Sequence, residues 1–197
     1  KKGLQAVATD AHRLVRYKRT DVKCPKTDSF IAPRKPLSLL KAAIPFTDEE
    51  ITVSYNSNHL FVKHGTTQMS CRLIDARFPD YKVVIPTDNP YKLTVNKNDF
   101  QSALRRVSVF SNKSTNQVAL SISGSELQLA AQDVDFSFEG NERMKCQYNG
   151  EDLMIAFNAR FLIEMLSAAE SDEITMELST PTKAGIIKPT DLGENEE

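Results

Sequence analysis

The residues best able to do chemistry together lie in one short stretch of the sequence, residues 8–14, which reads Ala-Thr-Asp-Ala-His-Arg-Leu. Within it a carboxylate, an imidazole and a guanidinium stand close together, at Asp10, His12 and Arg13. Histidine titrates near neutral pH, so Asp10 and His12 could act as an acid–base pair. A hydrolase would also need a nucleophile beside them, and the sequence has no Gly-x-Ser-x-Gly elbow to present one. The same residues could instead be the few polar groups that orient a bound ligand.

Other patterns typical of catalytic and cofactor-binding sites are absent from the sequence. The three histidines lack the His-x-x-x-His spacing of a zinc-binding helix, and the seven glycines include no phosphate-binding or dinucleotide-binding loop. Cys24, Cys71 and Cys146 are far apart and odd in number, so they predict neither a disulfide framework nor a metal site. We therefore expect no catalysis, no metal, no cofactor, inert buried or half-buried thiols, and a reducing cytoplasm. His59 and His64 are expected to face solvent from a strand.

Two short strands would position the residue 8–14 stretch. An apolar run, residues 4–8, leads into it, and residues 14–17 lead out with the alternation of a strand. The stretch is therefore predicted to be the tight connection between two antiparallel strands. In such turns the side chains of Thr9 and Asp10 bond to nearby backbone groups.

The rest of the chain contains a diffuse internal repeat, in which a short strand runs into a helix and two or three strands follow. We predict helices over residues 36–44, 97–110 and 159–169, each preceded by a strand, over residues 29–33, 91–96 and 152–157. Each helix has apolar residues at helical spacing, and Asn96 and Asn158 stand where N-caps belong. The other strands are predicted over residues 51–55, 59–64, 68–73, 118–122, 127–131, 136–144, 173–178 and 184–187. The fold class is therefore α+β, with antiparallel sheets and helices on one face.

Residues 75–89 do not fit the repeat and are predicted to form an extended linker between two domains. Pro79 and Pro86 fix its path. Its aromatic residues, Phe78 and Tyr81, are unusual for a flexible spacer, so we expect the linker to lie against the body of the protein.

The charges are divided unevenly along the chain, although the net charge is only −1. Residues 1–113 contain 20 Lys and Arg against 10 Asp and Glu, a net charge of +10, whereas residues 114–197 contain 5 against 16, a net charge of −11. Such asymmetry indicates one side that faces a polyanion and one acidic side. The alternative is a solvated surface on which the charges happen to segregate.

Four motifs together resemble the bacterial DNA polymerase III beta subunit, the DNA sliding clamp. The first motif is the residue 8–14 stretch. The others are residues 30–35 (Phe-Ile-Ala-Pro-Arg-Lys), 73–81 (Leu-Ile-Asp-Ala-Arg-Phe-Pro-Asp-Tyr) and 155–158 (Ile-Ala-Phe-Asn). They stand in the family's order and at its spacing over nearly the whole chain, and the Arg-Phe-Pro-Asp-Tyr run is the most specific of them.

The resemblance implies a non-catalytic processivity factor that encircles duplex DNA and tethers DNA polymerase and clamp-loader subunits. In this family each domain consists of two β-α-β-β-β units, with antiparallel sheets outside and helices on the inner face. By that pattern, residues 1–75 would be the C-terminal half of the second domain, residues 76–89 the linker, and residues 90–197 the third domain without its last strand. The full-length protein would be a homodimer. The alternative is a stand-alone module of the same fold that binds protein tails and does not encircle DNA.

The resemblance also implies a groove beside the residue 8–14 turn, where an extended peptide of the Gln-Leu-x-Leu-Phe type would dock. The matching positions are Thr9, His12, Arg13, Leu14, Pro79, Val84, Asn158 and Phe161. The apolar members would form the wall, and the polar members would fix the orientation of the peptide. The sequence departs from the family at Ala11, where glycine is common, and at Val83, where arginine is often found. The alternative is that His12 and Arg13 merely attach the turn to the linker.

Two further surfaces follow from the resemblance. Cations on and after the first two predicted helices would line the ring and hold DNA through its phosphates, without reading its sequence. They are Arg34, Lys35, Lys41, Arg105, Arg106 and Lys113. Val109 and Phe110 would lie at the subunit interface, with acidic neighbours such as Asp133 and Asp135. Val109 and Phe110 could equally be a helix end packed into its own core.

Overall fold

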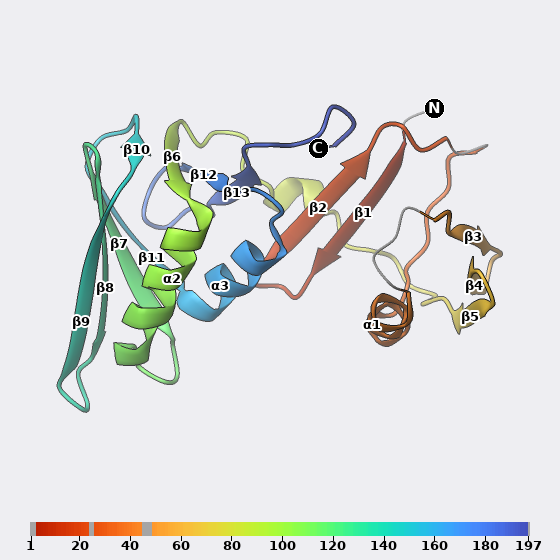
Figure 1. Ribbon diagram of the computed structural model, residues 1–197, viewed down its shortest axis with the longest axis horizontal. Helices are drawn as coiled ribbons and strands as arrows, with labels where there is room; N and C mark the ends of the chain where they lie inside the picture. Colours follow the sequence, from red (N-terminus) through yellow and green to blue (C-terminus); the bar gives the residue numbers. More distant parts are fainter. Residues whose placement is uncertain (1–2, 24–25, 45–48, 197) are drawn as a thin grey trace. The chain divides into compact units, whose positions relative to one another are not determined.

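The computed structural model describes residues 3–23, 26–44 and 49–196. The chain divides into two compact units, whose elements are labelled in Figure 1. The smaller unit lies within residues 24–80, and the larger unit combines residues 2–23 with residues 81–197. All strand pairs among the described residues are antiparallel, which confirms the predicted α+β class. No helix within the described ranges is long and apolar enough to cross a membrane.

The smaller unit has one helix and a three-stranded sheet of order β3-β4-β5. Its elements are α1 (Arg34–Ala43), β3 (Thr52–Tyr55), β4 (His59–His64) and β5 (Thr67–Arg72). Successive side chains of a strand point to opposite faces, so β4 directs Leu60 and Val62 into the core, where Cys71 joins them. Leu40 and Ile44, from the predicted apolar stripe of the helix, pack against this core.

Two predictions for the smaller unit are wrong. Residues 29–33 form no strand. In the larger unit the corresponding strand, β11, has a full ladder partner, whereas Ile31 shares a single backbone hydrogen bond with Ile74, 2.9 Å long. A strand forms only where its backbone N–H and C=O groups can bond to a neighbouring strand. The apolar character of residues 29–33 was therefore not enough to make them a strand. His59 is exposed as predicted, but the His64 side chain is largely buried, with its Nε2 3.1 Å from Oε2 of Glu49.

The larger unit has two four-stranded sheets, of order β10-β6-β12-β13 and β11-β7-β8-β9, and the two-stranded β1-β2 hairpin. Its strands are β1 (Leu4–Thr9), β2 (Leu14–Arg19), β6 (Tyr91–Asn96), β7 (Gln117–Ser123), β8 (Glu126–Asp133), β9 (Phe138–Lys145), β10 (Gln147–Tyr148), β11 (Leu153–Asn158), β12 (Glu173–Leu178) and β13 (Ile186–Pro189). Its helices are α2 (Lys97–Val107) and α3 (Ala159–Ala168). The strands predicted for this part of the chain are confirmed, with shifted ends.

Both helices of the larger unit bury their predicted apolar stripes in one core. Phe100, Leu104 and Val107 of α2 are buried there, and so are Leu162 and Leu166 of α3. Inward side chains from both four-stranded sheets complete this core. It is the larger of the two cores, and it supports α3, the helix that carries Phe161 of the predicted site.

Local signals set the ends of α2. The side chain of Asn96 accepts hydrogen bonds from the backbone N–H groups of Asn98 and Asp99, both 3.0 Å, which confirms the predicted N-cap. The predicted 97–110 helix is α-helical only to Val107 and continues as a 3-10 turn, η2 (Ser108–Phe110).

The cysteine thiols agree with the prediction where the structure describes them. Cys71 and Cys146 are buried and form no disulfide, and Cys24 lies outside the described residues.

The predicted linker is not extended throughout. It contains a 3-10 turn, η1 (Tyr81–Val84), whose Tyr81 hydroxyl accepts a hydrogen bond from the Gln5 side chain on β1. Further on, the Asn89 side chain donates to the backbone oxygens of Glu177 and Ala184, at 3.1 and 3.0 Å. From residue 81 onward the segment therefore lies against the larger unit, as its aromatic content predicted.

Candidate functional site

The β1–β2 turn is held together by its own side chains, as the sequence predicts. Thr9 Oγ1 donates to the backbone oxygen of Arg13 at 2.8 Å. The Asp10 carboxylate accepts from the backbone N–H groups of His12 (3.1 Å) and Arg13 (2.9 Å). These bonds satisfy backbone groups that the strand ladder leaves free at the turn. They fix the positions from which His12 and Arg13 project.

Both of these side chains converge on Phe161, in the first turn of α3. The guanidinium carbon of Arg13 lies 4.5 Å from the centre of the Phe161 ring, and the His12 ring stacks on it with centroids 5.5 Å apart. Figure 1 shows α3 beside the β1–β2 hairpin, so residues far apart in the sequence share one surface here. The structure thus brings together three of the predicted groove residues.

Arg13 is held between two carboxylates. Its Nε lies 3.0 Å from Asp10 Oδ2, and its Nη1 lies 2.8 Å from Glu164 Oε2 on α3. Hydrogen bonds from the Arg13 backbone and side chain lower the pKa of Asp10 from 3.8 to about 2. The bond to Glu164, followed by that to Asp10, raises the pKa of Arg13. Both shifts favour the charged forms of Asp10 and Arg13, and the bond to Glu164 joins the turn to α3.

Ala11, the residue that replaces a glycine common in the family, has a φ of +72°. A Cβ in this left-handed region costs about 1–2 kcal/mol, which glycine avoids. We expect Ala11→Gly to raise the free energy of unfolding by about 0.5–1 kcal/mol, because the higher entropy of glycine in the unfolded chain offsets part of the gain. Urea unfolding followed by circular dichroism measures the change.

The matched control is Ala6→Gly, in the neighbouring strand β1. There the same substitution removes a Cβ from ordinary strand backbone, so it should lower the free energy of unfolding by about 0.5–1 kcal/mol. Equal effects of the two substitutions would show that the left-handed conformation at residue 11 carries no strain.

Asn158 lies next to this cluster, but its amide is already engaged. Its Oδ1 accepts from the backbone N–H groups of Arg160 (3.0 Å) and Phe161 (3.3 Å), so it is the predicted N-cap of α3. Its Nδ2 donates to the backbone oxygen of Thr115 at 2.9 Å. Asn158 therefore sets where α3 begins and where Phe161 stands.

The apolar groove residues are more scattered. Leu14, the first residue of β2, is half-buried. Val84 ends η1 with 61% of its surface exposed, and Val83, where the family often has arginine, is exposed beside it. Pro79 belongs to the smaller unit, and it is exposed there.

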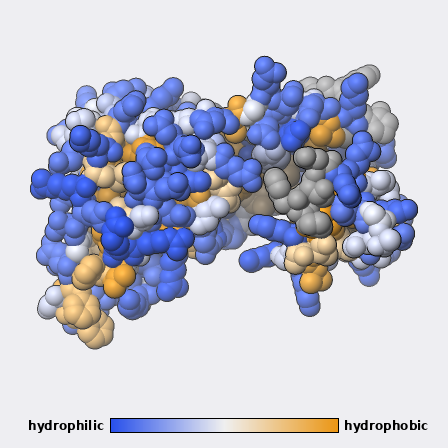
Figure 2. Space-filling view, in the orientation of Figure 1, coloured by the Kyte–Doolittle hydropathy of each residue, from blue (hydrophilic) through white to orange (hydrophobic). Residues whose placement is uncertain are grey.

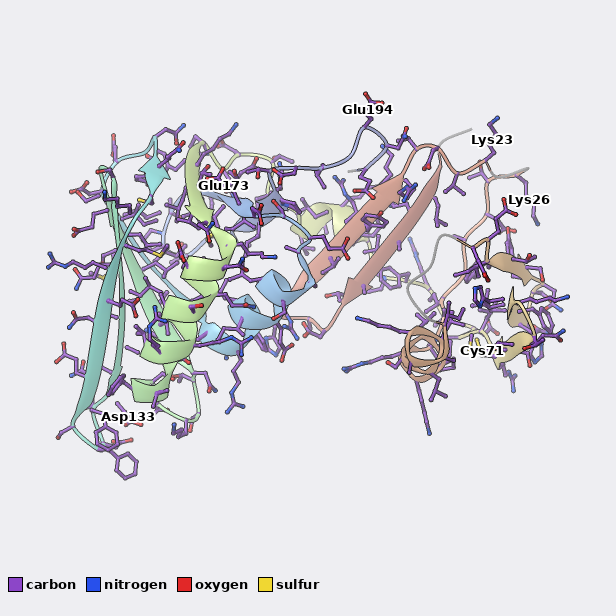
Figure 3. All side chains as sticks on the ribbon, in the orientation of Figure 1. Lys23, Lys26, Cys71, Asp133, Glu173 and Glu194 are labelled. Atoms are coloured by element: carbon purple, nitrogen blue, oxygen red, sulfur yellow. The ribbon has the colours of Figure 1, made fainter. Side chains whose placement is uncertain are left out.

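Helix α1 is the most basic element among the described helices. Its ten residues include Arg34, Lys35 and Lys41 and no acidic residue. All three cations are exposed, and no ion pair involving them occurs within the described residues. Figure 3 shows long side chains projecting outward from the axis of α1. Such a helix can attract phosphates with its full charge.

The predicted DNA-facing cations on α2 (Arg105 and Arg106) and after it (Lys113) are less uniform. Arg105 and Lys113 are exposed, and the described part of the chain gives neither of them an ion pair. Arg106 instead binds Glu142 on β9 through two hydrogen bonds, of 3.0 and 2.5 Å, which raise its pKa. Its charge is therefore offset by a neighbouring carboxylate, and its contribution to the positive potential is smaller than its position in the sequence suggests.

The end of α2 carries an exposed apolar surface. Val109 is 64% exposed, and the ring of Phe110 covers Gly140 on β9, where a Cβ would overlap it. Nearby, Phe136 in the β8–β9 turn and Phe138 at the start of β9 are exposed, and their rings stack with centroids 6.1 Å apart. Figure 2 shows apolar residues gathered at this end of the larger unit.

Asp133 does not stand on this surface as an exposed charge, which corrects the expectation for it. It is only 3% exposed, at the end of β8, where Figure 3 labels it. Its Oδ1 accepts from the backbone N–H of Asp135 at 3.2 Å and from the Asn112 side chain at 3.4 Å. Asp133 therefore shapes the β8–β9 turn, while Asp135 is exposed.

Comparison with known protein families identifies the relationship. The family model for the DNA polymerase III beta subunit, central domain, matches residues 1–80. The model for the DNA polymerase III beta subunit, C-terminal domain, matches residues 82–194. The chain belongs to the DNA polymerase III beta subunit family. Its resemblance through the four sequence motifs is thereby confirmed over nearly its whole length.

Individual members of the beta subunit family agree with this assignment. The chain is 30% identical over 185 residues to the beta sliding clamp of Haemophilus influenzae, covering 94% of this chain and 50% of that protein. It is 29% identical over 189 residues to the beta sliding clamp of Staphylococcus epidermidis, covering 95% of this chain and 50% of that protein. The chain thus spans about half the length of these relatives.

Solved structures of beta subunits match the fold. The Bartonella birtlesii DnaN sliding clamp bound to griselimycin has a TM-score of 0.88 and 31% identity, covering 98% of this chain and 52% of that one. The Pseudomonas aeruginosa DnaN sliding clamp bound to griselimycin has a TM-score of 0.92 at 24% identity, covering 99% and 53%. The predicted fold of repeated units with antiparallel sheets is therefore confirmed.

Sequence reasoning missed one member of the cluster, Glu164. A signal was present, because Glu164 follows Phe161 by three positions on a predicted helix, and residues at that spacing share a face. An acid beside a predicted groove residue could therefore have been paired with Arg13 of the turn.

Proposed function

We propose that this chain is part of a DNA sliding clamp, a non-catalytic processivity factor of the cytoplasm that encircles duplex DNA. It tethers DNA polymerase and clamp-loader subunits through a peptide groove, and its full-length form is a homodimer. The observation that carries the proposal is the match of two consecutive beta subunit domains, in order, over residues 1–80 and 82–194. Residues 1–75 would be the second half of the central domain, residues 76–89 the linker, and residues 90–197 the C-terminal domain.

The groove would lie along the β1–β2 turn and α3. The convergence of His12, Arg13 and Phe161 supports this proposal, because an aromatic ring edged by a few oriented polar groups suits an apolar anchor of a peptide. Thr9 and Asn158 would set the positions of these groups rather than bind the peptide themselves. Leu14 and Val84 would supply the apolar wall on the larger unit, and Pro79 of the smaller unit is kept as a groove residue on the resemblance to the family alone.

The DNA-facing wall would include Arg34, Lys35 and Lys41 on α1, with Arg105 and Lys113 from the larger unit. The absence of acidic residues from α1 supports this assignment. Arg106 would contribute less because Glu142 pairs with it. Contacts of this kind are made to phosphates in any sequence, which a sliding protein requires.

The subunit interface would include Val109 and Phe110. Both residues are exposed, and an exposed apolar patch commonly marks a surface that another protein covers, which supports this assignment. Asp135 would supply rim charge, and Asp133 would act only by shaping the adjacent turn.

Fluorescence anisotropy of a labelled Gln-Leu-x-Leu-Phe peptide tests the groove. We expect saturable binding to this chain and none of a scrambled peptide. Phe161→Ala should weaken binding at least about tenfold, since truncating an interface aromatic commonly costs more than 1–2 kcal/mol. Pro79→Ala tests the contribution of the smaller unit in the same assay. Equal binding of both peptides by the folded chain would contradict the proposed groove.

A further inference from the structure

The β1–β2 hairpin belongs to the larger unit but joins neither hydrophobic core. No residue of β1 or β2 is buried, and none belongs to the two cores formed by the described residues. At the turn, Arg13 bonds to Glu164 at 2.8 Å, and along β1 the Gln5 side chain donates to the Tyr81 hydroxyl. Because so little of the hairpin is buried, polar contacts of single residues have a large share in fixing its position.

A further contact lies at the open end of the hairpin, where the C-terminal segment reaches the outer edge of β2. The backbone N–H of Thr20 donates to the backbone oxygen of Asn195 at 2.9 Å. Arg19, whose other edge faces β1, forms an antiparallel bridge with Glu196. A bond of 3.0 Å from the Glu196 N–H to the Gly193 oxygen closes the turn before it. This segment thus covers backbone groups that an edge strand otherwise leaves exposed.

The Glu196 side chain adds two contacts to this pairing. Tyr17 and Arg19 are two positions apart on β2, so their side chains point to the same face. The Tyr17 hydroxyl donates to Glu196 Oε1 at 2.6 Å, and Arg19 Nη1 lies 3.5 Å from the same oxygen. The bond to the carboxylate raises the pKa of Tyr17, because it stabilises the protonated phenol. Hydrogen bonds to an ionised acceptor are about twice as strong as neutral ones.

The charges of the two segments are complementary. β2 contains three cations in six residues and no acid, whereas residues 191–197 contain four acids and no cation. The cations are Arg16, Lys18 and Arg19, and the acids are Asp191, Glu194, Glu196 and Glu197. Opposite charge favours the pairing of these two segments and suppresses the pairing of β2 with a basic one.

We propose that residues 193–196 form a strap that occupies the outer edge of β2 and holds the hairpin on the larger unit, with Glu196 as its anchor. The edge fits an extended segment that carries a carboxylate opposite Tyr17 and Arg19. The hairpin lies within the central-domain match, and Asn195 and Glu196 follow the C-terminal-domain match, so the strap joins segments of two different domains of the family. The inference does not depend on peptide or DNA binding.

Hydrogen exchange of backbone amides, followed by mass spectrometry on the full chain, tests the strap. Exchange is compared for the wild type, Glu196→Ala, Tyr17→Phe and the double variant. The control is Glu194→Ala, which removes the same charge from an exposed residue of the same segment, labelled in Figure 3. The paired strands β6 and β12, which contribute to the larger core, provide reference amides.

Amides of residues 14–20 should exchange at least about threefold faster in Glu196→Ala and in Tyr17→Phe, because losing the bond raises the population of the open hairpin. The double variant should exchange at about the rate of Glu196→Ala, since removing either partner already removes the bond between them. Glu194→Ala should match the wild type. The reference amides should exchange at the same rate in all variants.

Unchanged exchange of residues 14–20 in both single variants would overturn the inference. Equal acceleration by Glu194→Ala would also overturn it, because the effect would then come from the acidity of the segment and not from the Glu196 contact. Effects of Tyr17→Phe and Glu196→Ala that multiply in the double variant would show that the two residues act separately. Acceleration that extends equally to β6 and β12 would reflect a loss of global stability, and either result would remove Glu196 as the anchor.

Discussion

Replacing Phe100 with alanine is expected to lower the free energy of unfolding of the larger unit by about 3–5 kcal/mol. Phe100 is fully buried in α2, where it contacts the core shared by both four-stranded sheets. The substitution removes the transfer free energy of the ring and leaves a cavity that rigid surrounding strands fill only partly. Urea unfolding followed by circular dichroism measures the loss.

The control for this experiment is the same substitution at Phe136. Phe136 is 67% exposed on the β8–β9 turn, so Phe136→Ala should change the free energy of unfolding by about 0.5 kcal/mol or less. Similar losses for the two variants would mean that the core around α2 is not the main source of stability of this unit. Because α3 shares that core, Phe100→Ala should also reduce peptide binding as the unit unfolds.

Neutralising two cations of α1 should weaken DNA binding in a salt-dependent way. For Arg34→Gln/Lys41→Gln, we expect about tenfold lower affinity for duplex DNA at low salt. The slope of log affinity against log salt should decrease by about 2, because each lost phosphate contact no longer releases a counterion. Anisotropy with a labelled duplex, titrated at several salt concentrations, measures both quantities.

A matched double variant, Arg72→Gln/Lys63→Gln, separates position from net charge. These two residues are exposed on β5 and β4, on the sheet face opposite the Leu60–Val62–Cys71 core that α1 covers. The control should retain wild-type affinity and slope. Equal losses for both variants would favour the stand-alone peptide-binding module, in which attraction to DNA reflects only overall charge.

The elements that the sequence predicts well are those whose signals are local. Asn96 and Asn158 were identifiable as caps because an N-cap depends on residues two and three positions away. The turn at Thr9 and Asp10 was predictable for the same reason. Apolar periodicity likewise located α2 and α3, whose stripes are buried.

The errors concern features that depend on distant partners. Residues 29–33 have the apolar character of a strand, but a strand also needs a neighbouring strand to bond to. The local sequence does not show whether such a partner is present. The burial of His64 depends on its approach to Glu49, before β3. In the candidate site, the bond from Arg13 to Glu164 connects segments about 150 residues apart, so the turn alone could not predict it.

The contact between Phe110 and Gly140 links two positions in evolution. Any side chain at residue 140 would overlap the aromatic ring, so a change there requires a smaller or displaced residue at 110. Residue 140 therefore cannot gain a side chain while the Phe110 ring keeps its place against β9. In a lineage where residue 140 is no longer glycine, we infer that the ring at residue 110 has been displaced or replaced, and that the shape of the apolar surface has changed with it.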